Sequence, residues 1–234
     1  MKAPPYPRRL ALGLSLLYED RDLLVADKPA GLLSIAAGAE RERTAYWVLA
    51  EYLRRKGEKR RPAVVHRLDR DTSGVMIFAK SEPVKRKLMG NWDELVKERS
   101  YLALVEGELP SSAHPLTKGD SGVIDAPLGE DRGGRVVVRP EGRRAITRWK
   151  LLKAGKGYSL LSLKPETGRR NQIRAHLSWL GHPVAGDGKY QARTDPLNRL
   201  ALHAEGLVFQ HPRENRLLSF AVPAPGGFWT IFRE

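Results

Sequence analysis

The feature that most constrains this chain is a charged segment enclosed by two apolar runs, AVVHRLDRDTSGVMIFAKS at residues 63–81. Short apolar runs bounded by polar and glycine-containing segments are typical of buried strands, so we predict a strand–loop–strand unit. Continuing the two-residue period of the first strand would place Arg67 and Asp69 on one face and His66 and Leu68 on the other. Arg67 and Asp69 are therefore predicted to line one cleft.

The charges of this loop suit a chemical role for Asp69. The aspartate lies between Arg67 and Arg70 in the sequence, and nearby cations keep a carboxylate ionised at neutral pH, as a nucleophile or general base requires. The same kind of cluster is common in loops where ion pairs only hold the backbone, so by itself it does not establish catalysis. Asp71, two residues further on, leaves open a glycosidase with paired carboxylates.

Helix and strand patterns are mixed along the chain. Thr44 is a candidate N-cap for a helix that ends at Gly57, and Ser81 is a candidate N-cap for a helix with an apolar stripe that runs to Val96. Alternating or short apolar runs predict strands within residues 14–31, 100–109, 145–152 and 158–164. Because we find no internal repeat or linker, the sequence predicts one α+β fold with a large mixed or antiparallel sheet flanked by helices.

The chain is strongly basic, with 41 lysines and arginines against 27 aspartates and glutamates and a net charge of +14. Such a surplus attracts polyanions, so nucleic acid is the first partner to consider. Residues 1–11 are rich in proline and basic residues, which disfavours regular structure. We therefore predict a basic N-terminal arm at residues 1–11 and a single catalytic domain at residues 12–234.

The composition also disfavours several other classes. The chain has no cysteine, so it has no thiolate nucleophile or disulfide framework, and we expect it in the cytoplasm. The apolar run at residues 10–18 is too short to cross a bilayer, so we expect no membrane partner. Its 6 histidines form no metal-ligand pattern, and we expect no metal. Nothing in the sequence indicates an obligate dimer, and we expect a monomer.

A second basic cluster lies in KPETGRRNQIRAHLSWLG, residues 164–181. Thr167 is a candidate N-cap for a helix, which would place Arg169 and Arg170 in its first turn. Cations there oppose the helix dipole at a cost of some tenths of a kcal/mol, and a bound anion would relieve that cost. We therefore predict that Arg169 and Arg170 bind phosphate groups of the ligand. Arg174, one turn beyond Arg170, would face the same cleft and pair with a carboxylate.

With both clusters in view, the chain resembles the RluA family of RNA pseudouridine synthases. The segment HRLDRDTSG at residues 66–74 is similar to the signature that carries the family's catalytic aspartate. Further blocks resemble the family in order along the chain: DKPAG, SYLALVEG, PETGRRNQIRAHL, GHPVAGDGKY and RLALHAEGLVFQHP. The resemblance extends from about Leu12 to near the C-terminus.

This resemblance implies a pseudouridine synthase catalytic fold with a central RNA-binding cleft, and transfer or ribosomal RNA as the substrate. It implies that Asp69 is the catalytic carboxylate, Tyr101 the pocket tyrosine and Arg174 the partner of Asp69. Arg67 would help to displace the target base, and Leu161 would supply an apolar contact in the pocket. We expect Lys28, at a strand end, and Arg70, beside Asp69, to bind RNA as well. The isomerisation involves no net redox change, so no cofactor is expected.

The chain departs from the family pattern at Asn171, where a histidine is usual. We expect no S4 RNA-binding domain of the kind that many relatives carry. Two chemical routes stay open, because Asp69 could add to the nucleoside or remove a ribose proton. A non-catalytic RNA-binding module of the same fold is the alternative to an enzyme. The glycosidase is less well supported, because a neutral sugar gives no reason for the charge of +14.

Overall fold

The computed structural model describes residues 7–36, 38, 40–111 and 114–233 of the chain. Contacts within the chain define two compact units. Unit 1 consists of Met1–Arg99 and Ala204–Pro223, and unit 2 consists of Ser100–His203 and Ala224–Glu234. Within the described ranges, no helix is both long and apolar enough to span a membrane. The expected single catalytic domain at residues 12–234 stays a prediction.

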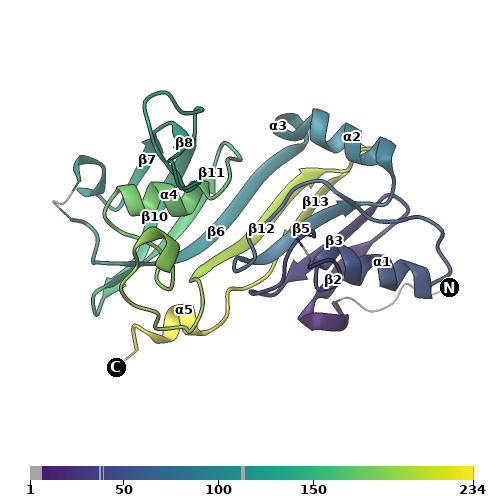
Figure 1. The fold of residues 1–234 in the computed structure, drawn as a ribbon, viewed down its shortest axis with the longest axis horizontal. Helices are drawn as coiled ribbons and strands as arrows, with labels where there is room; N and C mark the ends of the chain where they lie inside the picture. The colour runs from purple at the N-terminus through teal and green to yellow at the C-terminus, as the bar shows by residue number, and fades with distance from the viewer. Residues whose placement is uncertain (1–6, 37, 39, 112–113, 234) are drawn as a thin grey trace. The chain divides into compact units, whose positions relative to one another are not determined.

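Unit 1 is built on antiparallel strands (Figure 1). Its elements are β1 (Arg8–Arg9), η1 (Ala11–Gly13), β2 (Ser15–Glu19), β3 (Leu23–Lys28), α1 (Ala45–Arg55), β4 (Ala63–Val64), β5 (Ser73–Ala79), α2 (Glu82–Gly90), α3 (Trp92–Leu95) and β13 (Leu217–Ala221). The strands follow the order β1-β2-β3-β5-β12, with β4 paired to β5 and β13 paired to β12. Strands β6 (Val96–Glu106) and β12 (Leu202–Gln210) each have residues in both units.

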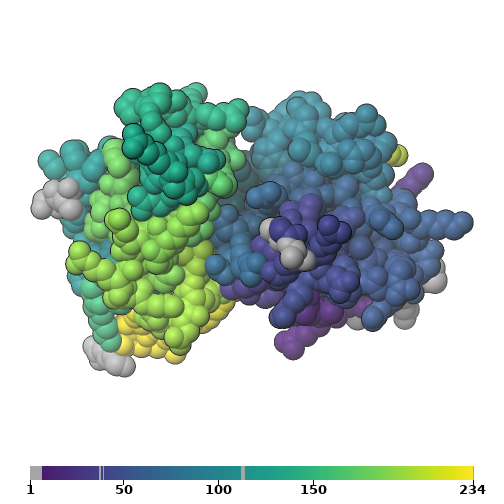
Figure 2. Space-filling model, viewed as in Figure 1, coloured from purple at the N-terminus to yellow at the C-terminus, as the bar shows by residue number. Residues whose placement is uncertain are grey.

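The core of unit 1 lies on β5, whose seven residues are all buried. Val75 and Ile77 pack with Val84 and Leu88 of α2. Helix α1 lies beside β2 (Figure 1), where the Tyr52 hydroxyl donates a 2.6 Å hydrogen bond to Glu19. In the space-filling view of Figure 2, the blue residues of α1 form part of the surface of this unit.

Unit 2 contains the antiparallel order β6-β11-β10-β7 and the separate hairpin β8-β9. Its further elements are η2 (Pro115–Thr117), β7 (Ser121–Asp125), β8 (Leu128–Glu130), β9 (Val136–Val138), β10 (Ile146–Gly155), β11 (Tyr158–Pro165), α4 (Gln172–Trp179), η3 (Gly188–Tyr190) and α5 (Gly227–Thr230). Ile173 and Leu177 of α4 belong to the buried apolar cluster of this unit, together with Leu102, Leu104 and Leu160 of β6 and β11. The β8-β9 hairpin lies at the surface shown in Figure 2.

The predicted α+β class with a large mixed or antiparallel sheet is confirmed, and so are the helix after Thr44 and the paired strands. Two boundaries differ from the prediction. The helix that follows Ser81 ends at Gly90, and Val96 already belongs to β6 rather than to a continuous helical stripe. Regular structure begins at Arg8, because the backbone of Arg8 and Arg9 pairs with Leu16 and Ser15 of β2. The first six residues of the predicted arm lie outside the described residues.

Candidate functional site

The loop that carries Asp69 connects β4 to β5 in unit 1. The burial of its side chains alternates as the two-residue period predicts: Leu68 is buried, whereas Arg67 is exposed and Asp69 is half-buried. The loop closes with a turn in which the Thr72 amide donates to the Asp69 carbonyl at 3.2 Å. The short apolar runs on either side fix the ends of the loop in the sheet, so its polar residues are presented at one strand end.

Two buried polar side chains hold the backbone on either side of Asp69. The Ser34 hydroxyl donates to the Leu68 carbonyl at 2.7 Å and accepts from the Leu68 amide at 3.2 Å. The Lys28 ammonium donates to the carbonyl of Arg70 at 2.8 Å and also to those of Pro29 and Leu32. Asp69 therefore lies between two anchored neighbours, which restricts the positions that its carboxylate can take.

Lys28 was predicted to bind RNA, and the structure gives its ammonium a different set of contacts. The side chain has no solvent exposure, and its charge is satisfied by carbonyl oxygens. A buried ammonium without such partners would be strongly destabilising. Lys28 is thus in a position to support the Asp69 loop from within, while its direct contact with RNA stays a prediction.

The motif HRLDRDTSG ends in glycine, Gly74, for a steric reason. It has a φ of +113°, and an added Cβ would lie 2.1 Å from the carbonyl oxygen of Ala204. No other residue can bring β5 this close to the neighbouring backbone without a shift of one strand. The glycine is therefore required by the packing of the strand that follows the Asp69 loop.

His66 precedes Arg67 and has a structural role in this unit. Its Nε2 accepts a hydrogen bond from the Ile77 amide at 3.1 Å, and its ring lies 5.1 Å from that of Trp92. Burial, together with the nearby Arg99 cation, lowers the pKa of His66 to about 3. The imidazole is therefore neutral near pH 7, as its role as an acceptor requires.

In unit 2, Arg174 of α4 is held by a carboxylate that the sequence analysis did not predict. Its Nε and NH2 atoms donate to the two oxygens of Asp187 at 2.6 and 2.8 Å. The guanidinium also lies 5.0 Å from the centre of the Tyr190 ring. This planar, two-bond arrangement fixes the orientation of the guanidinium. Asp187 lies in the quoted block GHPVAGDGKY, and an acidic residue between two glycines was the available signal.

The predicted start of α4 was wrong, and the error changes the argument for Arg169 and Arg170. The helix begins at Gln172 after Asn171, because the Thr167 hydroxyl instead accepts from the Ile146 amide and donates to Gln172. The two arginines lie in the turn before the helix, so they do not oppose its dipole in the first turn. Arg170 pairs with Glu130 at 3.0 Å, and Arg169 donates to the carbonyl of Arg144 at 3.0 Å.

Asn171 occupies a backbone position that suits its residue type. Its φ of +51° and ψ of +21° lie in the left-handed region, where asparagine is several-fold enriched among non-glycine residues. It makes no side-chain cap bond to α4. This conformation gives a local reason for asparagine at the position where the resembling family usually has histidine.

Two predicted pocket residues of unit 2 lie on neighbouring strands. Tyr101 of β6 is half-buried and pairs with Leu163 of β11, whereas Leu161 pairs with Ala103 and is fully buried. Leu161 belongs to the apolar core of the unit, against which Tyr101 packs. The Tyr101 side chain is therefore more accessible to solvent than that of Leu161.

The predicted site residues fall into two groups, one in each unit. Unit 1 carries Lys28, Arg67, Asp69 and Arg70, and unit 2 carries Tyr101, Leu161, Arg169, Arg170 and Arg174. Arg70 forms a 2.6 Å ion pair with Glu40. No group of three or more histidine, aspartate or glutamate side chains within the described ranges could hold a metal ion.

A family match, similar sequences and similar solved structures identify the family of this chain. Residues 22–179 match the family described as RNA pseudouridylate synthase. The RNA pseudouridine synthase YlyB of Bacillus subtilis is 36% identical over 92% of this chain and 70% of its own length. Ribosomal large subunit pseudouridine synthase D of Vibrio cholerae is 32% identical over 92% of this chain and 68% of its own.

One further relative matches over nearly its whole length: an RNA pseudouridine synthase of Zymomonas mobilis, 34% identical over 93% of this chain and 96% of its own. Among solved structures, human RNA pseudouridylate synthase domain containing 1 superposes with a TM-score of 0.72 over 95% of this chain and 86% of its own, at 24% identity. This structural likeness supports the predicted pseudouridine synthase fold. The chain therefore belongs to the RNA pseudouridylate synthase family of RNA-modifying isomerases.

Proposed function

We propose that this RNA pseudouridine synthase acts on uridines in structured transfer or ribosomal RNA, with Asp69 as its catalytic carboxylate. The observation that carries the assignment is the anchoring of both neighbours of Asp69, Leu68 by Ser34 and Arg70 by Lys28. Catalytic groups gain from being held in one position before the substrate arrives. Asp71 is exposed, whereas Asp69 is half-buried. Asp71 shares the anchored neighbour Arg70, but its other neighbour, Thr72, is held through the Asp69 carbonyl.

The reaction breaks the bond between ribose C1′ and uracil N1 and forms a bond from C1′ to C5 of the same base. The C5 proton is then lost and N1 gains a proton, so atoms and electrons balance without an external oxidant or reductant. Asp69 either adds to the nucleoside or removes a ribose proton. Both routes need an ionised carboxylate at the start.

Base rotation requires the uridine to leave its stack, at a cost of a few kcal/mol. Arg67 is exposed on the same loop as Asp69, and we assign to it the role of filling the space that the base vacates. Its guanidinium can stack on the neighbouring bases and contact phosphates at the same time. The cost of extrusion is smallest for a uridine that is already unstacked.

Arg174 is assigned to the chemical step, together with a positioning residue that was not predicted from sequence. A cation near Asp69 would keep its carboxylate ionised, and Asp187 would orient the guanidinium through the bidentate pair. Tyr101 is assigned to stacking on the base or to proton removal at C5. Lys28 is assigned to holding the Asp69 loop rather than to direct RNA contact, because it is fully buried.

Family membership favours the isomerase over a glycosidase that uses Asp69 and Asp71. The name of the Vibrio cholerae relative refers to the large ribosomal subunit, so large-subunit ribosomal RNA is the first substrate to test. The monomeric state, the cytoplasmic location and the absence of a cofactor stay predictions.

The first test replaces the proposed catalytic carboxylate. Asp69→Asn should abolish pseudouridine formation while RNA affinity changes less than about threefold, because the amide keeps the shape of the side chain but removes the charge needed for the chemistry. Asp71→Asn is the matched control and should keep most of the activity. Pseudouridine is mapped by sequencing unmodified ribosomal and transfer RNA after incubation with each variant. Full activity of Asp69→Asn would overturn the assignment.

A further inference from the structure

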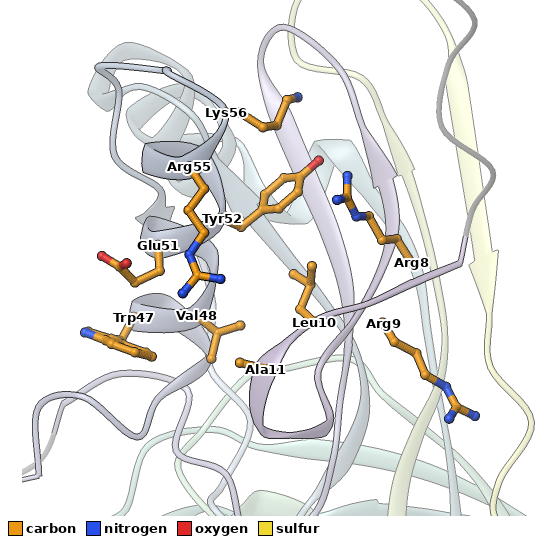
Figure 3. Close-up of a pocket in the computed structure, with 10 residues that line it drawn as sticks. All are labelled: Arg8, Arg9, Leu10, Ala11, Trp47, Val48, Glu51, Tyr52, Arg55 and Lys56. Atoms are coloured by element: carbon orange, nitrogen blue, oxygen red, sulfur yellow. The ribbon is translucent and has the colours of Figure 1, made fainter.

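Unit 1 contains a cavity of about 340 Å³ between α1 and the first described segment of the chain. Its size lies near the lower end of the range of roughly 300–1,000 Å³ found for small-ligand pockets. The lining residues are shown in Figure 3: Arg8, Arg9, Leu10, Ala11, Trp47, Val48, Glu51, Tyr52, Arg55 and Lys56. Apolar and aromatic side chains are thus combined with four cations and one carboxylate.

The charges around this cavity are only partly neutralised. Glu51 is engaged by Arg54 at 2.8 Å, and Lys56 pairs with Glu19 at 2.8 Å. Among the residues that the structure describes, no carboxylate lies within ion-pair distance of Arg8 or Arg55. Arg55 interacts electrostatically with Glu51, and Arg8 with the Tyr52 hydroxyl. Neither contact is an ion pair within 4 Å, so part of this positive charge is left for an anionic ligand.

The arrangement of the side chains gives the cavity two different surfaces (Figure 3). Arg55 extends from α1 over the space between the helix and the first segment, and Arg8 reaches toward the Tyr52 ring from the opposite side, with its guanidinium 5.3 Å from the ring centre. Val48 and Leu10 lie beneath them, with the half-buried Trp47 at one end. An apolar and aromatic floor below cations is the arrangement that binds unpaired nucleotides, through stacking of the base and contacts to phosphate.

Helix stability alone does not account for this set of residues. Cations in the last turn of α1 interact favourably with the helix dipole, which would explain Arg54 and Arg55. It does not explain Arg8, which lies on β1 and reaches toward the helix from another part of the chain, whereas Arg9 lines the cavity with its side chain directed away from α1 (Figure 3). The two cations Arg8 and Arg55, one on each side of an apolar cavity, favour an external anion as the ligand.

The cavity is connected to the Asp69 loop by hydrogen bonds within unit 1. The amide of Tyr46, at the start of α1, donates to the Ser34 carbonyl at 3.1 Å, and the Ser34 hydroxyl holds Leu68 beside Asp69. From Tyr46 to Arg55 the helix extends about 14 Å, at about 1.5 Å per residue. A strand of RNA that presents a uridine to Asp69 is therefore within a few nucleotides of this cavity.

We propose that the cavity lined by Trp47, Arg55 and Arg8 binds an unpaired nucleotide that flanks the target uridine in the RNA substrate. This inference rests on the proposed function for the identity of the substrate. The base lies on the floor formed by Val48 and Leu10 beside the Trp47 ring, and the phosphates lie against Arg8 and Arg55. The site adds affinity for RNA and takes no part in the chemical step.

The first test measures binding of a fluorescein-labelled, single-stranded oligoribonucleotide of mixed sequence by fluorescence anisotropy. The double variant Arg8→Ala/Arg55→Ala should bind about tenfold more weakly near 0.1 M salt, and the slope of log K against log salt should fall by about 1 to 2, as expected for two lost phosphate contacts. Lys87→Ala/Arg86→Ala, which removes two exposed cations from α2 of the same unit, is the matched control. Equal losses in both double variants would overturn the proposal.

The second test locates the RNA directly. Ultraviolet crosslinking of the same RNA, followed by trypsin digestion, should give a nucleotide adduct on the peptide from Thr44 to Arg54, which contains Trp47, and Trp47→Ala should remove it. Adducts confined to other peptides would overturn the proposal. Pseudouridine formation is scored separately, so a wild-type chain that binds RNA through this cavity but forms no pseudouridine would support the cavity and refute the proposed function.

Discussion

At the scale of single residues, the position of Asp69 depends on side chains that are distant in sequence. Ser34 and Lys28 are buried polar residues that donate hydrogen bonds to the backbone of the loop, at Leu68 and Arg70, and Lys28 also donates to the turn at Leu32. The sequence identified Asp69 and Arg67 because the motif places them in one short loop. It did not identify Ser34 or Asp187, because a lone serine or aspartate has no local pattern that predicts a distant partner.

Ser34→Ala tests whether this anchoring serves catalysis. The variant leaves the buried amide and carbonyl of Leu68 without their partner, at a cost of roughly 1–3 kcal/mol, and it frees the backbone next to Asp69. We expect kcat to fall at least tenfold with little change in KM, because positioning affects the chemical step more than RNA binding.

Ser81→Ala is the control for that experiment, because Ser81 caps α2 in the same unit. Loss of a helix cap costs about 1 kcal/mol, so stability falls without any change near Asp69. Rates are measured at a temperature where both variants are fully folded by circular dichroism. Similar kcat values for the two variants would show that Ser34 contributes only stability.

At the scale of secondary structure elements, α1 is joined to β2 and to the end of β5 by a compact ionic group around Glu19. Glu19 accepts from Tyr52 and Lys56 at the C-terminal end of the helix and from Lys80 after β5. The sequence predicted the helix itself, since Thr44 and Gly57 mark its ends, but not this group, whose members are separated by up to 61 positions. The start of α4 was mispredicted for a related reason, because Thr167 bonds to β10 instead of capping the helix.

The Glu19 group should make unit 1 sensitive to acid. Burial alone raises the pKa of Glu19, but hydrogen bonds from Lys56, Lys80 and Tyr52 outweigh this effect and lower the pKa from its ordinary value of 4.5 to about 2. A carboxylate with a lowered pKa in the folded state stabilises the fold above its unfolded pKa, and this contribution is lost as the pH falls toward the folded pKa. The free energy of unfolding should therefore decrease between about pH 4.5 and pH 2.

Glu19→Gln should be less stable than the wild type at pH 7 and should lose less stability across that acidic window, since its amide does not titrate. Urea unfolding followed by circular dichroism at a series of pH values measures both effects. Glu94→Gln, which changes an exposed glutamate on α3, should keep the pH dependence of the wild type. If Glu19→Gln and the wild type lose equal stability on acidification, the group around Glu19 does not set the acid response.

At the scale of the whole molecule, the net charge of +14 predicts attraction to RNA but not which cations make contact. Several basic residues of the predicted site are already engaged: Arg70 by Glu40, Arg170 by Glu130 and Lys28 by three carbonyls. The carboxylates Glu40 and Glu130 and the Arg70 carbonyl lie at least 30 positions away from the cations they engage, so a count of charges could not reveal these partners. The number of phosphate contacts should consequently be far smaller than the number of basic residues.

Comparison of Arg67 with Arg70 tests whether ion pairing within the protein limits the contribution of a cation to RNA binding. No carboxylate among the described residues lies within ion-pair distance of the exposed Arg67, whereas Arg70 is 2.6 Å from Glu40. Arg67→Ala should reduce the slope of log K against log salt by about 1 for RNA binding, because each lost phosphate contact releases about one counterion fewer. Arg70→Ala should change the slope by less, because Glu40 already neutralises much of that charge.

Glu40→Gln completes the experiment, because it removes the partner of Arg70 without touching either arginine. If the ion pair limits the contribution of Arg70, this variant should bind RNA more tightly than the wild type at low salt and should show a steeper salt dependence. In the double variant Glu40→Gln/Arg70→Ala the gain should disappear. Affinities are measured from about 50 to 200 mM salt, where counterion release dominates. Equal slopes for the two single arginine variants, with no effect of Glu40→Gln, would mean that total charge rather than the pairing of individual side chains governs RNA binding.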